Sequence, residues 1–222
     1  MNKLETKVIL NKPAEKPLGA VIWLHGLGAD YNDFVPIVPE LRLPVSLKFV
    51  FPNAPVIPVT INNGFQMRAW YDILDMGDLH REVDERGILA SISQINQLIE
   101  ELVAEGFSYE QIVIAGFSQG GVISYYSGLN CANKLAGMLI LSSYLPDISL
   151  LDLAQIKNKV GLPILICHGN QDPVVSMAYA KKATEHLQQL GLNYEWHEYP
   201  MQHSVCYDEI QAISHWLQKI YA

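Results

Sequence analysis

The stretch QIVIAGFSQGGVISYYS, residues 111–127, decides how this chain is interpreted. A run of apolar residues leads into Gly116-Phe117-Ser118-Gln119-Gly120, and a second apolar segment follows. A serine in a G-x-S-x-G sequence between a strand and a helix is typical of a strained turn that exposes a nucleophilic hydroxyl. The alternative is a tight turn that serves packing alone. The flanking strand and helix patterns favour a nucleophile at Ser118.

Outward from this stretch, strand-like and helix-like segments alternate along the chain. Strands are predicted at 19–25, 47–52, 111–117, 135–143, 162–169 and 193–200. The middle four of these are nearly continuous apolar runs, as expected for strands that are covered on both faces. Helices are predicted at 86–106, 119–129, 176–191 and 207–221, with Ser176 as an N-cap and Gly106 and Gly191 as stops. The order predicts an α/β fold, a doubly wound and mostly parallel sheet with helices on both faces. We expect residues 4–10 to form an antiparallel edge hairpin with strand 19–25.

The composition of the chain excludes several classes of partner and site. The 222 residues are half hydrophobic and carry a formal charge of -8 without a Lys/Arg cluster, which argues against a nucleic-acid partner. The three cysteines are widely spaced, so they predict neither a disulfide framework nor a metal or redox pair. No signal peptide and no apolar run long enough to span a membrane is evident. We therefore expect one domain, 1–222, in the cytoplasm. The motifs of metal and nucleotide sites are missing from the sequence, and no cofactor is expected.

A nucleophilic serine needs a base and an acid, which follow it in the chain order of strand-turn-helix hydrolases. Four histidines lie beyond both Ser118 and the acidic candidate Asp172, and of these His203 alone sits in a loop just after a predicted strand. His203 is therefore the predicted base. Asp172, which follows strand 162–169, is the predicted acid, and Asp147 after strand 135–143 is the alternative. The acid would hold the imidazole in the correct tautomer and stabilise its protonated form.

The oxyanion that forms during acyl transfer needs two N–H donors. The first is the backbone N–H of the residue after the nucleophile, Gln119, and the second comes from a loop after an early strand. Glycines in WLHGLGAD, residues 23–30, allow backbone amides to turn inward, and Leu27 is the predicted second donor. His25 is interpreted as structural.

With these pieces placed, the chain resembles the acyl-protein thioesterase and small carboxylesterase (phospholipase/carboxylesterase) family of α/β-hydrolases. The segments LHGLGAD, FPNAPVIPVTINNG, MRAWYDI, GFSQGG, HGNQDPVV and HSV occur in the family's order over nearly the whole chain. The resemblance implies an α/β-hydrolase fold, the triad Ser118, Asp172 and His203, and the Leu27 and Gln119 amides in the oxyanion hole. It also implies fatty-acyl ester or thioester substrates, such as lipidated proteins or lysolipids, and often homodimers.

The long segment 53–80 has no clear repeat period and much apolar surface. Loops of this length in a compact domain are usually functional. By family likeness it borders the acyl channel, with Trp70, Ile73 and Leu74 as lining residues; otherwise it is a lid packed on the core with no ligand role. Tyr144 stands where some relatives have tryptophan, and Val174 or Val175 is expected to close the opposite wall. Contact of this segment with a membrane surface is left open.

Two other functions remain. A carboxylesterase for small soluble esters would use the same triad, and it differs only in substrate length and leaving group. A noncatalytic binding module on a hydrolase scaffold would be expected to have a broken triad, whereas all three residue types are in place here. A dienelactone-type hydrolase would usually carry a cysteine nucleophile, and Ser118 argues against it. The sequence therefore predicts a serine esterase or thioesterase that works through an acyl-enzyme.

Overall fold

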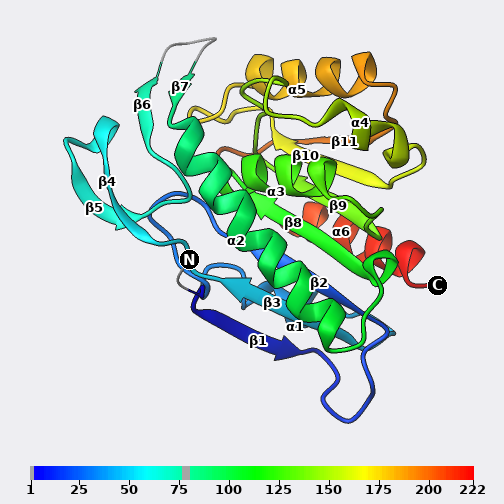
Figure 1. The fold of residues 1–222 in the computed structure, drawn as a ribbon. Coiled ribbons are helices and arrows are strands. Elements are labelled where there is room, and N and C mark those ends of the chain that lie inside the picture. The colour runs from blue at the N-terminus through cyan, green and yellow to red at the C-terminus, as the bar shows by residue number, and fades with distance from the viewer. Residues whose placement is uncertain (1–2, 77–80) are drawn as a thin grey trace.

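The computed structural model describes residues 3–76 and 81–222, arranged around a seven-stranded sheet (Figure 1). The strand order is β1-β3-β2-β8-β9-β10-β11, and all pairs are parallel except β1 with β3. The strands of this sheet are β1 (Thr6–Leu10), β2 (Gly19–Leu24), β3 (Leu47–Pro52), β8 (Ile112–Phe117), β9 (Gly137–Leu141), β10 (Ile164–Gly169) and β11 (Glu195–Tyr199). The α-helices are α1 (Ile37–Glu40), α2 (Glu85–Ala104), α3 (Gln119–Asn130), α4 (Leu153–Ile156), α5 (Met177–Gln189) and α6 (Tyr207–Ile220). The predicted mostly parallel α/β sheet is confirmed.

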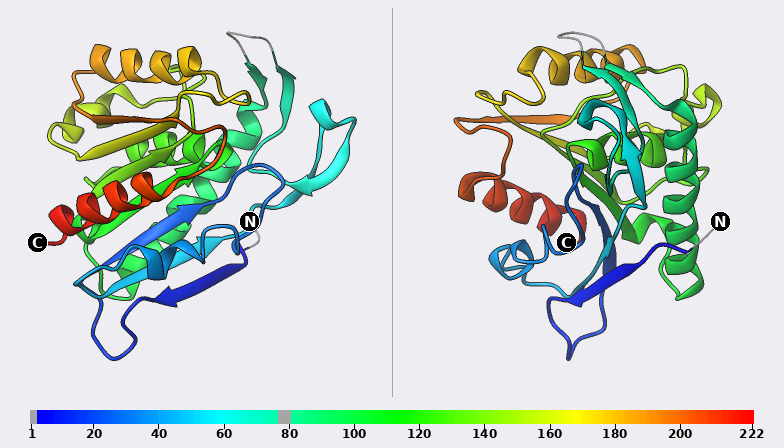
Figure 2. Two further views of the ribbon diagram at one scale, coloured as in Figure 1. Left: turned by 180° about the vertical axis from the view of Figure 1, so that it is seen from behind. Right: turned by 90° about the vertical axis from the view of Figure 1, so that its left-hand side faces the viewer.

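Hydrophobic side chains are buried on both faces of the sheet, which explains the continuous apolar runs in its central strands. Alternate residues of β2 point to opposite faces, so that Ile22 and Trp23 belong to separate clusters. Helices α2, α3 and α5 pack on the Ile22 face, and α1 and α6 pack on the Trp23 face (Figure 2). Because helices cover both faces of the sheet, a substrate can reach the ends of the strands but not the faces.

The expected edge hairpin was wrong in its pairing. Strand β1 is antiparallel, as predicted, but it pairs with β3 and not with β2. Both sides of β2 are already occupied, by β3 on one side and β8 on the other. Because β3 lies outside β2, β1 pairs with β3 and forms the edge strand on this side of the sheet.

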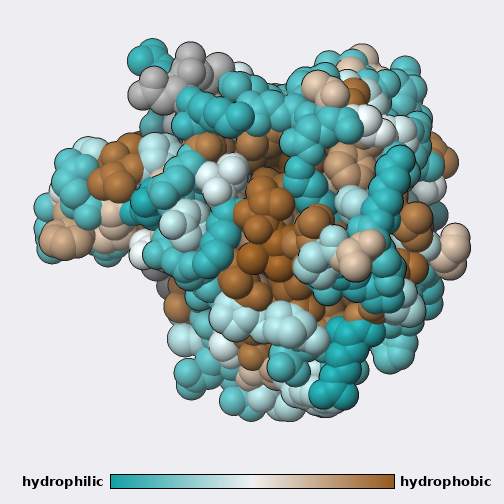
Figure 3. Space-filling model, turned by 90° about the horizontal axis from the view of Figure 1, so that it is seen from below, coloured by the Kyte–Doolittle hydropathy of each residue, from teal (hydrophilic) through white to brown (hydrophobic). Residues whose placement is uncertain are grey.

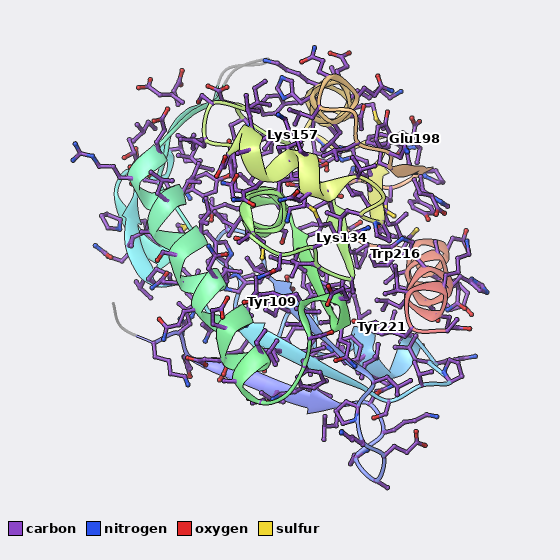
Figure 4. The ribbon with its side chains drawn as sticks, turned by 45° about the vertical axis from the view of Figure 1, so that its right-hand side comes forward. Tyr109, Lys134, Lys157, Glu198, Trp216 and Tyr221 are labelled. Atoms are coloured by element: carbon purple, nitrogen blue, oxygen red, sulfur yellow. The ribbon has the colours of Figure 1, made fainter. Side chains whose placement is uncertain are left out.

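The predicted helix ends agree with the structure within a few residues. Ser176 caps α5, where its hydroxyl accepts a hydrogen bond from the Tyr179 N–H, and Gly106 and Gly191 follow the last turns with positive φ. At the C-terminus, the Tyr221 hydroxyl donates to the carbonyl oxygens of Ala20 and Gln111, which fastens the end of α6 to the sheet (Figure 4). Among the described residues, no helix has both the length and the apolar character needed to cross a bilayer.

Segment 53–80, expected as a long loop, contains regular structure. Two hairpins project from the edge of the molecule near the carboxyl ends of the strands (Figure 1). The first consists of β4 (Val56–Val59) and β5 (Phe65–Arg68), and the second of β6 (Ile73–Met76) and β7 (Arg81–Val83). Residues 77–80, the last part of the predicted loop, lie outside the described residues.

Candidate active site

Ser118 occupies the sharp turn between β8 and α3. Its φ of 53° and ψ of -119° are strained for a residue with a side chain. Two hydrogen bonds hold the turn: Ser118 N–H donates to the Leu141 carbonyl at 2.9 Å, and the buried Ser143 hydroxyl donates to the Ser118 carbonyl at 2.7 Å. Strain that is fixed by surrounding contacts is a common property of functional sites.

The glycines beside Ser118 are required by close backbone approach. A Cβ on Gly116 would lie 2.3 Å from the Gly120 carbonyl oxygen, and a Cβ on Gly120 would lie 2.5 Å from the His25 carbonyl oxygen. Both distances are well below van der Waals contact. Absence of side chains here lets the start of α3 press against the end of β2, which carries the predicted oxyanion loop.

Asp172 and His203 meet at the ends of β10 and β11. The His203 Nδ1 and Asp172 Oδ2 atoms are 2.7 Å apart, and Asp172 Oδ1 accepts hydrogen bonds of 2.8 Å from the Val174 and Val175 N–H groups. Burial alone would raise the pKa of Asp172, but the His203 hydrogen bond and the two N–H groups outweigh it, so that its pKa is lowered. Asp172 is therefore ionised at neutral pH and accepts the Nδ1 proton, which leaves Nε2 as the basic nitrogen of His203.

Ser118 and His203 line the same cavity, of about 290 Å³, at the carboxyl ends of the strands. The Phe117 ring lies against the imidazole, with ring centroids 4.7 Å apart. Among the described residues no hydrogen bond joins the Ser118 hydroxyl to His203; such bonds are often long in unliganded enzymes and shorten when substrate binds. The two residues therefore share a cavity without a hydrogen bond between their side chains.

The two predicted oxyanion donors, Leu27 and Gln119, also line this cavity. Gln119 is the first residue of α3, where the backbone N–H has no acceptor within its own helix. His25 is buried, and both ring nitrogens are used: Nε2 accepts from the Ala54 N–H, and Nδ1 lies 2.7 Å from the Gly26 carbonyl oxygen. Burial lowers the pKa of His25, so the ring is neutral and holds the loop in place.

Only some of the residues predicted to line the acyl-binding site lie at the cavity. Ile73 and Tyr144 line the cavity, as does Val174, and Ile61 joins them without having been singled out from the sequence. The remaining three predicted residues, Trp70, Leu74 and Val175, are not among its lining residues. Trp70 and Val175 are buried in the core, whereas Leu74 is 39% exposed.

Asp147, the alternative acid, has a different role in the structure. Its carboxylate accepts hydrogen bonds of 2.9 Å from the Ser149 N–H and hydroxyl, and these bonds lower its pKa. The Asp147 carbonyl oxygen accepts from the Tyr126 hydroxyl. These contacts stabilise the turn after β9, and the carboxylate on His203 is that of Asp172.

Two supporting contacts were not predicted from the sequence, that of the Ser143 hydroxyl and those of the Gln119 side chain. Ser143 could have been found, because it follows the end of β9 and polar residues gather at the carboxyl ends of parallel strands. The Gln119 side chain is buried and bonded to residues 70 and 71, nearly fifty positions away, and no pattern in the sequence signals that contact.

This chain is similar to known proteins over nearly its whole length. Residues 5–221 match the phospholipase/carboxylesterase family. The chain is 36% identical to an acyl-protein thioesterase 1 of Mycosarcoma maydis, with 99% of this chain and 98% of that protein covered. It is 38% identical to one of Neurospora crassa, with 89% and 84% covered.

Solved structures of similar proteins share the fold of this chain. Arabidopsis thaliana SOBER1 superposes with a TM-score of 0.83 at 29% identity and covers 92% of this chain and 99% of its own. A Zea mays acyl-protein thioesterase 2 superposes with a TM-score of 0.83 at 24% identity, which supports the fold, and covers 98% and 99%. This chain therefore belongs to the phospholipase/carboxylesterase family of α/β-hydrolases and is a hydrolase of the esterase and thioesterase type.

Proposed function

We propose that Ser118, His203 and Asp172 form the catalytic triad of a serine hydrolase that cleaves acyl esters and thioesters, with acylated proteins or lysolipids as its substrates. The observation that carries the proposal is the 2.7 Å contact of His203 Nδ1 with Asp172, in a cavity that also contains the strained Ser118. The names of the relatives support the substrate class: the similar fungal proteins are acyl-protein thioesterases.

The reaction follows from the positions of these groups. His203 Nε2 removes the proton of the Ser118 hydroxyl as the oxygen attacks the acyl carbonyl carbon. The Leu27 and Gln119 N–H groups stabilise the resulting oxyanion. His203 then protonates the departing alcohol or thiol, and an acyl-enzyme remains. Water, activated by His203, releases the carboxylic acid and restores Ser118.

The acyl chain is assigned to the apolar part of the cavity. Ile61, Ile73 and Tyr144 line it together with Val174. Apolar side chains in a concave site favour a hydrocarbon chain, because its burial removes apolar area from water. A carboxylesterase for small soluble esters is the second candidate, supported by the modest cavity volume of about 290 Å³.

The test is a series of p-nitrophenyl esters from acetyl to dodecanoyl, hydrolysed by the wild type and by Ser118→Ala. We expect the variant to lose at least about 10³-fold in kcat, since its residual rate comes from binding and the oxyanion hole alone. Ser127→Ala, at the other end of α3, is the matched control, because its buried hydroxyl has no partner among the described residues. Its rates should equal those of the wild type.

The chain-length profile separates the candidates. Rates that peak at medium or long chains support the acyl-chain assignment, and a steep fall beyond butyryl supports the small-ester candidate. Hydrolysis that survives Ser118→Ala would refute the triad. No hydrolysis at any length by the wild type would favour a binding module.

The proposal also covers the location of the enzyme in the cell, its oligomeric state and its contact with membranes. We place it in the cytoplasm as a single domain, 1–222, and as a homodimer, with transient contact to membrane surfaces. Three free cysteines suit a reducing compartment, and Phe65 on the β4–β5 hairpin is 68% exposed, which suits contact with lipid. Light scattering tests the dimer, and co-sedimentation with liposomes tests the membrane contact.

A further inference from the structure

One short segment, residues 68–71 at the end of the β4–β5 hairpin, makes hydrogen bonds next to both predicted oxyanion donors. It bonds to the loop that contains Leu27 and to the side chain of Gln119. On the side of the Leu27 loop, Gly28 N–H donates to the Arg68 carbonyl oxygen at 2.8 Å, and the Trp70 indole N–H donates to the His25 carbonyl oxygen at 2.9 Å. His25 and Gly28, on either side of Leu27 in the loop, are thus bonded to this segment.

On the side of the nucleophile, the Gln119 side chain makes the corresponding pair of bonds. Its Oε1 accepts from the Trp70 backbone N–H at 2.8 Å, and its Nε2 donates to the Tyr71 carbonyl oxygen at 2.7 Å. A backbone donor on one side and a backbone acceptor on the other fix the orientation of the amide. Only a side chain with both an acceptor and a donor at this length satisfies the two partners.

Three of these four contacts are shielded from water, and the fourth, between Gly28 and Arg68, lies nearer the surface. Trp70, Tyr71 and Gln119 are all buried, and the Trp70 carbonyl oxygen is satisfied by the buried Ser91 hydroxyl. A buried polar group that loses its partner keeps the cost of its desolvation, so each of the three buried bonds strongly favours one arrangement. The four bonds hold two segments that are far apart in sequence, 25–28 and 118–119, at a defined separation.

We propose that residues 68–71 act as a brace that sets the spacing of the two oxyanion donors, with the Trp70 indole and the Gln119 side chain as positioning residues. The inference rests on the proposed hydrolase function and adds to it a role for Gln119 beyond its backbone N–H. It also replaces the acyl-lining role expected for Trp70. Donors aimed at a developing oxyanion are effective only when their positions are fixed before the reaction.

The experiment compares Trp70→Phe, which keeps an aromatic ring but removes the indole N–H, with Gln119→Met, which keeps the length but removes both amide bonds. We expect Trp70→Phe to lower kcat about 3- to 10-fold and Gln119→Met about 10- to 100-fold, the range between one weakened hydrogen bond and a lost oxyanion donor. The reduction should be the same for acetyl and dodecanoyl esters. The inhibition constant of an alkyl trifluoromethyl ketone, whose adduct with Ser118 places an oxyanion in the hole, should rise by the factor by which kcat/KM falls.

Trp216→Phe serves as the packing control, because Trp216 is also buried but lies on α6, away from the cavity. It should lower the melting temperature without changing kcat or the inhibition constant. If Gln119→Met does not fold, Trp70→Phe and the inhibition constant still decide the question. A Trp70→Phe loss that grows with acyl length would make Trp70 a lining residue and overturn the brace, as would an unchanged inhibition constant in both variants. Failure of the brace would leave hydrolysis dependent on Ser118, whereas failure of the proposed function would not.

Discussion

The two ends of the sheet make an instructive comparison. The larger cavity, of about 490 Å³, lies between β1 and the end of α2, where Val8, Leu10, Pro17 and Phe107 form part of its wall. Figure 3 shows hydrophobic side chains gathered on the face seen from below, within a hydrophilic rim. The smaller cavity, at the carboxyl ends of the strands, is lined by Ser118, His203 and the two predicted amide donors. Cavity volume alone does not mark a reactive site, and we place the reaction in the smaller cavity because groups with complementary chemical roles converge there.

The largest expected effect concerns Asp172, at the carboxyl ends of the strands. Asp172→Asn should lower kcat about 10³- to 10⁴-fold, because an amide no longer holds the His203 tautomer or stabilises its protonated form. Steady-state kinetics with a p-nitrophenyl ester measures this. Asp147→Asn is the control and should stay within about twofold of wild type, as its carboxylate contacts Ser149. Similar losses in both variants would show that the acid is wrongly assigned.

A buried carboxyl group on α6 should make stability depend on pH. Glu209 is fully buried, and its carboxylate oxygens have no hydrogen-bond partner among the described residues. Burial raises its pKa from 4.5 to about 8. In the folded chain the group thus keeps its proton over a pH range in which the unfolded chain has released it, and stability falls as pH rises from about 4.5 to about 8.

Glu209→Gln should remove this dependence, because the amide does not titrate. We expect the variant to gain about 3 to 5 kcal/mol in unfolding free energy over the wild type at pH 8, and far less at pH 5. Urea unfolding at the two pH values measures the difference. Glu185→Gln, on the exposed side of α5, should leave the pH profile unchanged. Parallel profiles for wild type and Glu209→Gln would contradict the prediction.

Two glycines at opposite ends separate catalytic from purely structural effects. Gly120→Ala would place a methyl group 2.5 Å from the His25 carbonyl oxygen, so we expect a loss of about 1 to 3 kcal/mol in stability and a lower kcat. Gly106→Ala meets no atom within 4 Å but retains a φ of +106°, and it should cost about 1 kcal/mol with unchanged kcat. Thermal melts and ester kinetics on both variants test this. An active Gly120→Ala would mean that α3 can shift without harm.

The smallest effect is expected in the larger cavity. Val8 is 48% exposed, and Val8→Thr conserves its shape, so stability should change by less than about 0.5 kcal/mol and kcat should not change. The same two measurements apply. A clear loss of hydrolysis would show that this end of the sheet communicates with the catalytic cavity, and the contrast between the ends would no longer hold.

Local sequence signals were sufficient for much of the fold. Continuous apolar runs predicted the central strands, because strands covered on both faces have no solvent side to mark with polar residues. Ser176 and the stop glycines predicted helix ends, because caps are local hydrogen-bond requirements. The pairing of β1 was beyond such signals: the edge open to it depends on where β3 lies, and that is a long-range choice. The two hairpins in segment 53–80 were also missed, since their strands are short and mostly exposed.

The sequence by itself determined the set of candidate catalytic residues: a serine among glycines at the end of a strand, followed in order by an aspartate and a histidine, each just beyond another strand. That information is local, because each residue is identified by the strand that precedes it. Only the tertiary structure decided which carboxylate meets His203, which apolar residues line the cavity, and how the Leu27 loop and Gln119 share residues 68–71. Those relations join positions tens of residues apart, and they are fixed by packing and by buried hydrogen bonds, which no local pattern encodes.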